Sequence, residues 1–471
     1  QVLGLAVQNT LVQMLERDAG IPSMTIARFL AQWGRLLHEP GNASLLGEAR
    51  SALGDHVLVL DEASMVSNDD KAKLVRLANL AEVHRLVLVG DKRQLGAVDA
   101  GKPFDLVQQA GIERANMDVN LRGRDPVLRR AQAAAQEGRI DDALRALAPS
   151  TIEARGDGAI VAAEKWLSLS PADRDRTSIY ASGRALRSAV NEAVQRGLKA
   201  NGELGPRSGR LTVHSRVNVT HEELRYLRTY QPGIVLNFRS RDSTQKLSKG
   251  DYTVKTIDHA RKQLVLEDRK GRLRNFNPAR MRPGANESRL SLFDRKSLSI
   301  IEGDKIRWTD NDHKRGLFNA DQARIVAIDT KGVLVETSAG KELRLSRGDP
   351  MLKRMDLAYA LNAHMAQGLT SDRGIAVMDS RERNLANRQT FLVTVTRLRD
   401  GLTLIADNAE KLGRVIKSNS GEKASALEVT QRLKVAAAKG LSQDKDVGSA
   451  SPASDKPELT KERVKPFEIG I

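Results

Sequence analysis

The sequence predicts an α/β chain of two doubly wound units, the second interrupted by a β-rich segment. Residues 57–60 and 86–89 are apolar at every position, as strands buried on both faces of a parallel sheet require. A second α/β pattern opens at 177–180 and continues into a long amphipathic helix over about 183–198. Between about 205 and 350, segments of strand character are separated by Asp, Gly and Lys turns.

Within the first unit, each of the two apolar strands ends in a turn that carries a carboxylate. Asp61 and Glu62 follow the first strand, and Gly90 and Asp91 follow the second. In a parallel sheet, ligands bind at the carboxyl ends of the strands. We therefore expect a ligand site at this edge, and a helix over about 127–147 to close the unit.

The first of these turns has the arrangement of a Walker B site. In such a site the first carboxylate, here Asp61, holds Mg²⁺ through water, and the second, here Glu62, polarises the attacking water. The run Asp-Glu-Ala-Ser could equally open a helix. Taken alone, the motif leaves both interpretations open.

The second turn favours the nucleotide interpretation. Gly90 permits a tight turn, and Gln94, four residues later, is a neutral donor and acceptor suited to sensing a γ-phosphate. The two motifs lie about 30 residues apart, each after an apolar strand. Together they predict a site for ATP and Mg²⁺.

The charge of the chain indicates a polyanionic partner. The formal net charge is +17, and residues 201–300 hold 21 Lys and Arg against 10 Asp and Glu. A solvated face is the usual explanation of a charge run, but this concentration favours a phosphate-facing surface. The absence of cysteine excludes disulfides and fits a reducing compartment. No apolar run reaches the length of a membrane span, so we expect a cytoplasmic protein without one.

The predicted boundaries follow these patterns. One or two small β-barrels are expected in the β-rich segment, and no internal repeat is evident in the sequence. The expected segments are a first lobe, the start of a second lobe, a basic β-rich insertion, the completion of the second lobe, and a helical segment with a disordered tail: 1–150, 151–205, 206–350, 351–415 and 416–471.

These motifs, in this order, resemble the superfamily 1 helicases of the RecD-like branch. The likeness is strongest to the helicase half of MobF-type conjugative relaxase-helicases and runs from Val2 to about Asp407. The resemblance implies two RecA-like P-loop NTPase lobes, the first truncated at its N-terminus, with an SH3-like insertion in the second. It also implies that Asp61, Glu62 and Gln94 act in catalysis on one wall of an ATP cleft.

Four further segments carry the resemblance. Residues 4–9 look like motif Ia and 25–30 like the next DNA-contact motif, although Ala27 replaces the usual His. Residues 120–122 look like motif IV and 393–399 like motif VI. By this likeness, strand contacts come from Val7, Gln8, Asn9 and Thr25, and the catalytic arginines are Arg122 and Arg397.

Residues 359–370 look like motif V, with two departures from its pattern. Asn362 stands where Thr is common and Met365 where Lys is common, which we expect to alter the grip on DNA without abolishing it. The likeness assigns DNA contacts to Asn362, His364 and Thr370, and ATP contacts to Asp91, Gln367 and Gly368.

A phosphate-binding loop should precede motif Ia. The only Gly-x4-Gly-Lys spacing, Gly96 to Lys102, is followed by Pro103 rather than Ser or Thr and comes after Gln94, so we reject it. We expect the loop upstream of Gln1 in a longer parent chain, and negligible ATP hydrolysis by this chain alone.

The resemblance implies an ATP-dependent helicase portion that moves on single-stranded DNA during plasmid transfer. The implied partners are single-stranded DNA, a relaxase domain in the same parent chain, and conjugative coupling and relaxosome proteins. Two alternatives stay open: a non-hydrolysing module that binds single strands, and a RecD-like repair helicase. The retained carboxylates and arginines favour the motor.

Overall fold

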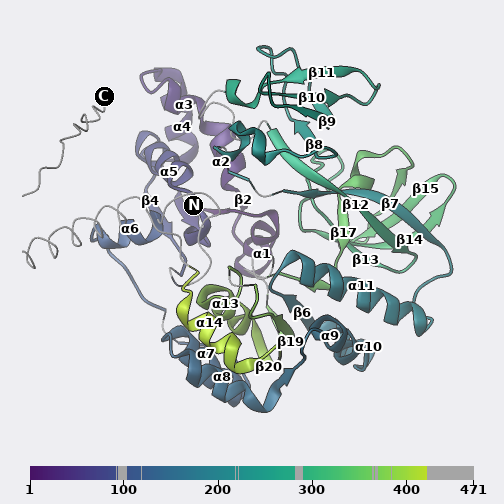
Figure 1. Cartoon of the computed structure of the whole chain (residues 1–471). Coiled ribbons are helices and arrows are strands. Elements are labelled where there is room, and N and C mark those ends of the chain that lie inside the picture. The colour runs from purple at the N-terminus through teal and green to yellow at the C-terminus, as the bar shows by residue number, and fades with distance from the viewer. Residues whose placement is uncertain are drawn as a thin grey trace, which may run out of the picture. The chain divides into compact units, whose positions relative to one another are not determined.

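The first α/β unit is built on a four-stranded parallel sheet in the order β2-β1-β3-β4 (Figure 1). Its strands are β1 Val2–Ala6, β2 Ser23–Thr25, β3 Val57–Leu60 and β4 Arg85–Leu88. Its helices are α1 Asn9–Ala19, α2 Ile26–Trp33, α3 Arg35–His38, α4 Ala43–Leu53, η1 Ala63–Met65, α5 Asn68–Leu80 and α6 Pro103–Gln109. The core between them includes Leu5, Phe29, Leu58 and Leu74, each fully buried.

The second α/β unit has a five-stranded parallel sheet in the order β18-β6-β19-β20-β5. Its strands are β5 Thr151–Glu153, β6 Thr177–Ala181, β18 Ala360–Leu361, β19 Ser371–Met378 and β20 Leu398–Ala406. Its helices are α7 Pro126–Gln136, α8 Ile140–Leu147, η2 Ala148–Ser150, α9 Gly158–Leu167, α10 Pro171–Arg176, α11 Arg184–Ala200, α13 Arg388–Thr396 and α14 Ala409–Ser418. The predicted α/β class is confirmed.

One boundary differs from the prediction. Residues 126–150 were expected in the first lobe, with one helix over about 127–147, but Gly138, with φ of 76°, separates α7 from α8. Leu128 and Leu147 pack in one core with Phe391 and Leu404 of the second unit. The sequence could not show which sheet the two amphipathic helices cover, because either sheet offers an apolar face.

The inserted β-rich segment forms two antiparallel sheets. The first β unit is the six-stranded sheet β11-β10-β9-β8-β12-β7, and the second β unit is the five-stranded sheet β16-β15-β14-β13-β17 (Figure 1). The elements of the first are β7 Ser208–Arg216, η3 Glu223–Arg225, η4 Leu227–Thr229, β8 Val235–Phe238, β9 Gly250–Asp258, β10 Gln263–Glu267, β11 Leu273–Phe276, η5 Pro278–Arg280 and β12 Leu290–Ile301. Those of the second are β13 Lys305–Trp308, β14 Gln322–Asp329, β15 Gly332–Thr337, β16 Glu342–Ser346, η6 Pro350–Lys353 and β17 Met355–Leu357.

The two β units repeat one topology, which the sequence did not reveal. In each, four strands form an antiparallel meander, a short 3₁₀ turn follows, and a fifth strand pairs with the first: β12 with β8, and β17 with β13. The loop after the first strand closes on an isolated bridge in both, Asp242 to Leu247 and Asp312 to Leu317. The β-rich segment therefore ends at Leu357 rather than at 350, because β17 completes the second copy.

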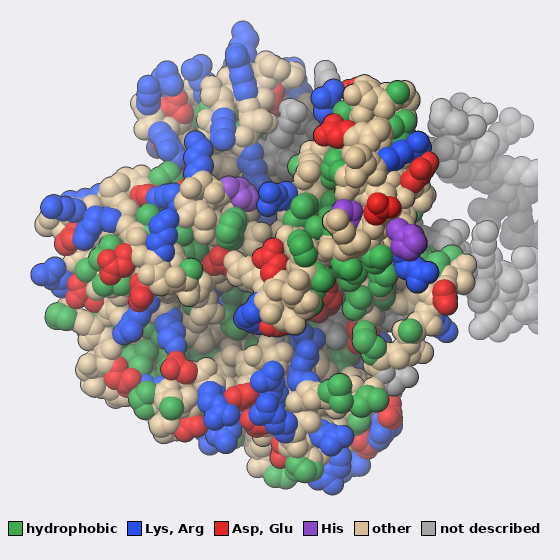
Figure 2. Space-filling view, turned by 180° about the vertical axis from the view of Figure 1, so that it is seen from behind, with side chains coloured by type: hydrophobic (Ala, Val, Ile, Leu, Met, Phe, Trp, Pro, Cys, Tyr) green, Lys and Arg blue, Asp and Glu red, His purple; other side chains and the backbone are tan. Residues whose placement is uncertain are grey.

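The computed structural model describes residues 1–91, 93, 103–117, 119–217, 219–220, 222–281, 290–362, 365, 370–382 and 384–421. No helix within these ranges is long and apolar enough to cross a membrane. Lys and Arg side chains gather over the first β unit, at the upper left of Figure 2. Of that unit's basic residues, Arg261, Lys262, Lys270 and Arg274 are exposed.

Candidate nucleotide and single-strand site

The carboxylates Asp61 and Glu62 sit at the carboxyl edge of the first sheet. The Asp61 amide donates to the Leu5 carbonyl at 2.9 Å, which extends the pairing of β3 with β1 into the turn. The Glu62 amide donates to Asp61 Oδ1 at 2.8 Å, and Glu62 has the left-handed φ of 47°. This conformation is uncommon for a residue with a side chain and marks a turn held by its surroundings.

Gly90 and Asp91 follow β4 beside this turn. A Cβ at Gly90 would lie 3.2 Å from the backbone nitrogens of Ala63 and Ser64, so any other residue would push the two turns apart by a few tenths of an ångström. Asp91 Oδ1 accepts a hydrogen bond from the Arg93 amide at 2.9 Å. Gln94, the predicted γ-phosphate sensor, lies outside the described residues.

Lys71 of α5 supports the carboxylate turn from beneath. It is 2% exposed, and its Nζ donates to the Ala63 carbonyl at 2.9 Å and lies 5.2 Å from the centre of the Phe104 ring. Burial lowers the pKa of this ammonium to about 8. This contact could not be predicted from the sequence, because one lysine in an amphipathic helix is ordinarily solvated.

Arg397, at the end of α13, faces this carboxylate turn from the second unit. It is 3% exposed, and burial lowers the pKa of its guanidinium, while the negative charges of Glu62, Asp91 and Asp61 act in the opposite direction. Burying an arginine costs free energy unless charge compensates it, and these carboxylates supply that charge. The structure thus brings four of the predicted site residues together.

Arg122 joins the same group. Its Nη1 donates to the Thr396 carbonyl at 2.8 Å, one residue before Arg397. Burial is the largest influence and lowers the pKa of Arg122, the charge of Arg397 lowers it further, and Glu62 opposes both. Two guanidiniums therefore stand near one another and near Glu62, an arrangement suited to a group that carries several negative charges.

A buried amide holds the two arginine segments together. Gln132 of α7, 1% exposed, donates through Nε2 to the carbonyls of Val395 and Leu398, both at 3.0 Å. Its Oε1 accepts from Asn120 Nδ2 at 2.7 Å. The sequence predicted the arginines but missed Gln132, which lay in a helix with no motif.

The predicted strand contacts of the first unit share one edge. Val7, Gln8 and Asn9 follow β1, and Ala6 pairs in register with Thr25 of the parallel neighbour β2. The Thr25 hydroxyl accepts a hydrogen bond from the Arg28 amide at 3.2 Å and so caps α2. These residues lie along the sheet edge that also carries Asp61, and their contacts with DNA stay a prediction.

The motif V segment begins at the carboxyl end of β18. Leu361 pairs with Tyr180 of β6, and the next residue, Asn362, accepts a hydrogen bond through Oδ1 from the Met365 amide at 2.9 Å. Thr370 directly precedes β19 and is half-buried. The predicted site residues of this segment that lie outside the described part are His364, Gln367 and Gly368.

Two family models match the chain in order. Residues 1–152 match an AAA domain, and residues 213–300 match the DNA relaxase TraI 2B/2B-like domain. The second match covers most of the first β unit and leaves out the second.

The relatives are conjugation proteins. The chain is 24% identical over 478 residues to the multifunctional conjugation protein TraI of Escherichia coli, which covers 92% of this chain and 26% of TraI. It is 31% identical over 146 residues to the conjugal transfer protein TraA of Rhizobium radiobacter, covering 31% of this chain and 12% of TraA. The chain thus spans about a quarter of its longest-matching relative.

Among solved structures, the chain is similar to Pif1 helicases. The Candida albicans protein matches with a TM-score of 0.46 and 13% identity, covering 93% of this chain and 95% of that one. Bacteroides Pif1 bound to single-stranded DNA matches with a TM-score of 0.45 and 13% identity, covering 93% of each. The two family models and the conjugation proteins confirm the predicted resemblance of this chain to conjugative relaxase-helicases.

Proposed function

We propose that the chain is the helicase portion of a conjugative relaxase-helicase and couples ATP turnover to movement along single-stranded DNA. The observation that carries the proposal is the meeting of Arg122 and Arg397 with Asp61, Glu62 and Asp91 across the two α/β units. Carboxylates opposite arginines, with the arginines on a separate unit, suit a cleft that closes on a nucleotide and opens after hydrolysis.

The residues present fit Mg²⁺ and ATP in part. Within the described ranges, no group of three or more His, Cys, Asp or Glu could hold a metal ion by itself. Mg²⁺ commonly keeps several waters and binds through one or two carboxylates together with substrate phosphates, which is the contribution Asp61 can make. When bound, Mg·ATP would supply the scissile phosphoanhydride and neutralise its charge.

The roles of the side chains follow from their positions. Glu62, in its fixed left-handed turn, orients and polarises a water molecule. Arg397 and Arg122 hold the charge that develops on the transferred phosphoryl group, and the burial of Arg397 strengthens its interaction. Asp91, at the same carboxyl edge and bonded to the Arg93 amide, contacts ATP.

We propose that the phosphate-binding loop reaches the site from a strand that pairs with the open edge of β4. Residues 86–89 are continuously apolar, which is typical of an interior strand, yet among the described strands β4 has only β3 as neighbour and is half-buried. A further strand paired with this edge would deliver a glycine-rich loop to the carboxyl edge beside Asp61. We propose that a segment of the parent chain supplies it.

The proposed partner is single-stranded DNA, which lies across Val7–Asn9, Thr25 and the motif V segment and reaches the basic first β unit. A relaxase domain in the parent chain and conjugative coupling and relaxosome proteins are proposed partners in the cytoplasm. The sequence similarity to TraI over 92% of this chain supports these assignments.

Turnover in a parent chain that carries the phosphate-binding loop tests the proposal. Glu62→Gln should bind ATP and DNA but fail in hydrolysis, and Arg397→Ala should lose roughly 10³–10⁵ in rate. Arg414→Ala is the matched control, because this exposed arginine of α14 pairs with Glu410 one turn away in the same helix. Normal turnover in either site variant would remove that residue from catalysis.

The alternative of a non-hydrolysing binding module gives a different result. In that case the parent chain would bind single strands with the same affinity with or without ATP, and Glu62→Gln would change nothing. ATP hydrolysis stimulated by single-stranded DNA would exclude this alternative.

A further inference from the structure

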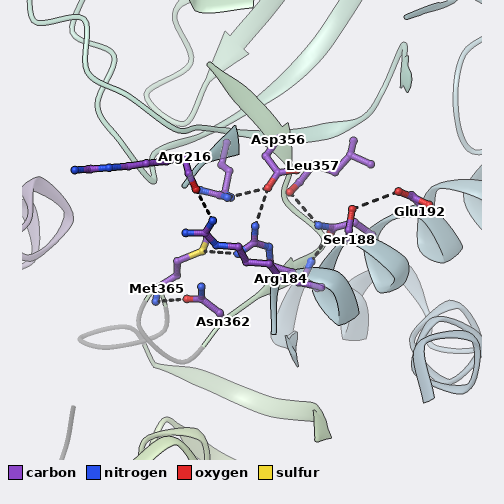
Figure 3. A network of polar contacts seen from close by, with 12 residues as sticks. Arg184, Ser188, Glu192, Arg216, Asp356, Leu357, Asn362 and Met365 are labelled. Atoms are coloured by element: carbon purple, nitrogen blue, oxygen red, sulfur yellow. Dashed lines mark hydrogen bonds and ion pairs between the residues drawn. The ribbon is translucent and has the colours of Figure 1, made fainter. Parts of the chain in front are cut away.

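Three arginine side chains, one carboxylate and the backbone carbonyl of a fourth arginine meet where α11, the two β units and the motif V segment come together (Figure 3). We call this the arginine cluster: Arg184, Arg187, Arg216, Arg307 and Asp356. Arg184 lies in the first turn of α11, and its Nη1 donates to the backbone carbonyl of Arg216 at the end of β7. Arg184 and Arg216 are exposed.

One carboxylate oxygen of Asp356 accepts hydrogen bonds from two of these arginines. Arg187 Nη2 donates to Asp356 Oδ2 at 3.0 Å, and Arg307 Nη2 donates to the same atom at 2.8 Å. Arg307 and Asp356 lie opposite one another in the pairing of β13 with β17. The side chains of Arg187 and Arg307 are only 11% and 10% exposed, so a single carboxylate compensates two buried guanidiniums.

This leaves an excess of positive charge in a place of low solvent access. Burial lowers the pKa of Arg187, the charges of Arg307 and Arg184 lower it further, and only Asp356 opposes them among the strongest influences. The Nε atoms of Arg187 and Arg307 are buried and have no hydrogen-bond partner among the described residues. Two poorly exposed arginines that share one carboxylate are therefore weak evidence of a purely stabilising role.

The arginine cluster borders the motif V segment directly. Arg187 Nη1 lies 3.9 Å from the sulfur of Met365, whose amide is held by Asn362. Asn362 follows β18, and β18 pairs with β6, the strand that leads into α11. The exposed Arg184 therefore stands at the same carboxyl edge of the second sheet as the predicted strand contact at Asn362.

We propose that the arginine cluster binds a phosphodiester group of single-stranded DNA, with Arg184 as the direct contact and Arg187 and Arg307 supplying uncompensated charge behind it. The inference rests on the proposed function and adds a site that no motif assigned. Guanidiniums bind phosphate oxygens in pairs of parallel hydrogen bonds, and solvent screens the charges of the poorly exposed Arg187 and Arg307 less than that of an exposed arginine. An anion here would supply the negative charge that Asp356 alone cannot.

Binding of a fluorescent oligothymidine to the full chain across a salt series tests the direct contact. Arg184→Ala should weaken binding roughly tenfold at low salt and make the slope of log K against log salt shallower by about 0.7, one phosphate contact. The control is Arg196→Ala, an exposed arginine three turns further along the same helix. Equal losses in both variants, or no change in the Arg184 variant, would overturn the proposal.

Asp356→Asn tests the buried part of the cluster. Removing its charge leaves two buried arginines without compensation, so the variant should melt at a lower temperature than the wild type in buffer without multivalent anions. Inorganic phosphate and oligothymidine should each raise its melting temperature more than that of the wild type, because a ligand of the native state stabilises it. If Asp356 is only a structural ion-pair partner, neither ligand will raise the melting temperature of the variant more than that of the wild type.

The outcomes separate this inference from the proposed function. If the wild-type chain does not bind oligothymidine, the proposed function fails whatever the variants do. If it binds and Arg184→Ala behaves like Arg196→Ala, the helicase assignment stands and the arginine cluster is structural. If Asp356→Asn does not fold, the salt slope of Arg184→Ala still decides.

Discussion

The two β units share a topology but hold the same loop in opposite ways. In the first, Gln245 exchanges hydrogen bonds with the backbone of Asn277, at 3.2 and 2.7 Å. In the second, the corresponding Arg315 binds Asp349 through two bonds of 2.5 and 2.9 Å. We call each of these contacts the pin of its unit. Both pins tie the loop after the first strand to the residue that caps the 3₁₀ turn. One pin is neutral and the other is ionic, so the topology requires the pin but not its chemistry.

The surface charge of the two loops differs in the same sense. Residues 239–249 carry four Lys and Arg and one Asp, whereas residues 309–319 carry two Lys and Arg and two Asp. In the second loop Arg315 is committed to Asp312 and Asp349, and in the first the cations are exposed. The comparison shows that the second loop uses its arginine in ion pairs within the fold, while the first loop exposes its cations to solvent.

Removing the ionic pin should have the largest effect. Arg315→Ala leaves Asp349, 11% exposed, without its guanidinium and should lower the free energy of unfolding by about 3 kcal/mol. Trp308 lies in β13 of the same unit, so in a background of Trp33→Phe and Trp166→Phe its fluorescence reports urea unfolding there. Gln245→Ala, the matched change in the first unit, should cost only about 1 kcal/mol. Equal losses would mean that the charge of the pin is irrelevant.

Acid should affect the first β unit before the second. Burial lowers the pKa of His214 in β7 to about 4 in the folded state. The unfolded state, in which the pKa of this histidine is about 6.5, therefore binds a proton at a higher pH than the folded state does. As a result, the free energy of unfolding falls by about 2–3 kcal/mol as the pH drops from about 6.5 to about 4. Burial raises the pKa of Asp349, but Arg315 outweighs this and sets it below its usual value. Its stabilisation is therefore lost only as pH falls below about 3.9.

Hydrogen exchange followed by mass spectrometry, peptide by peptide from pH 7 to pH 4, can separate the two units. Peptides of β7 and β12 should lose protection in this range, and those of β14 and β15 should keep it. His214→Leu should flatten the dependence in the first unit. Parallel loss in both units would show that they unfold together.

The loop cations should matter for DNA rather than for stability. Replacing Arg239, Arg241, Lys246 and Lys249 with Gln should weaken binding of single strands about tenfold and reduce the salt slope, since each lost phosphate contact changes it by about 0.7. Lys314→Gln in the second loop is the control and should leave affinity unchanged. A salt series read by fluorescence anisotropy measures both.

Transplanting the ionic pin into the first unit should have the smallest effect. Asn277 Oδ1 accepts from the Ala279 amide at 3.0 Å, just as Asp349 Oδ1 accepts from the Met351 amide at 2.9 Å. The double change Gln245→Arg with Asn277→Asp should therefore be tolerated and add at most about 1 kcal/mol that decreases with salt. A destabilisation above this size would show that the two copies differ in backbone geometry.

Much of the fold, and the residues proposed for the candidate site, could be predicted from the sequence because local patterns encode them. An apolar run ending in Asp61-Glu62 needs no distant partner to be recognised, and motifs IV and VI fixed Arg122 and Arg397. The packing of 126–150 on the second sheet could not be predicted, since it depends on which apolar face is open. The duplication of the β units was hidden for a related reason: its shared pins are made of different residues, Gln245 in one copy and Arg315 in the other.

The residues that support the candidate site could not be predicted from the sequence either. Lys71, Gln132 and Asp356 lie in ordinary helices and strands, and only their three-dimensional neighbours give them a role. A buried lysine and a shared carboxylate have no sequence signature. The roles of such residues can be recognised only from their burial and their contact partners in the structure.

Gln132 sets limits on how the peptide between the two α/β units can change length. Residues 111–117 after α6 are exposed, and an insertion there would leave every contact of Gln132 in place. One residue added between Asn120 and Asp125 would move Arg122 away from the Thr396 carbonyl while Arg397 stayed where it is. We therefore expect insertions and deletions among related chains before Asn120 rather than between Asn120 and Asp125, because the side-chain amide of Gln132 fixes the position of that segment.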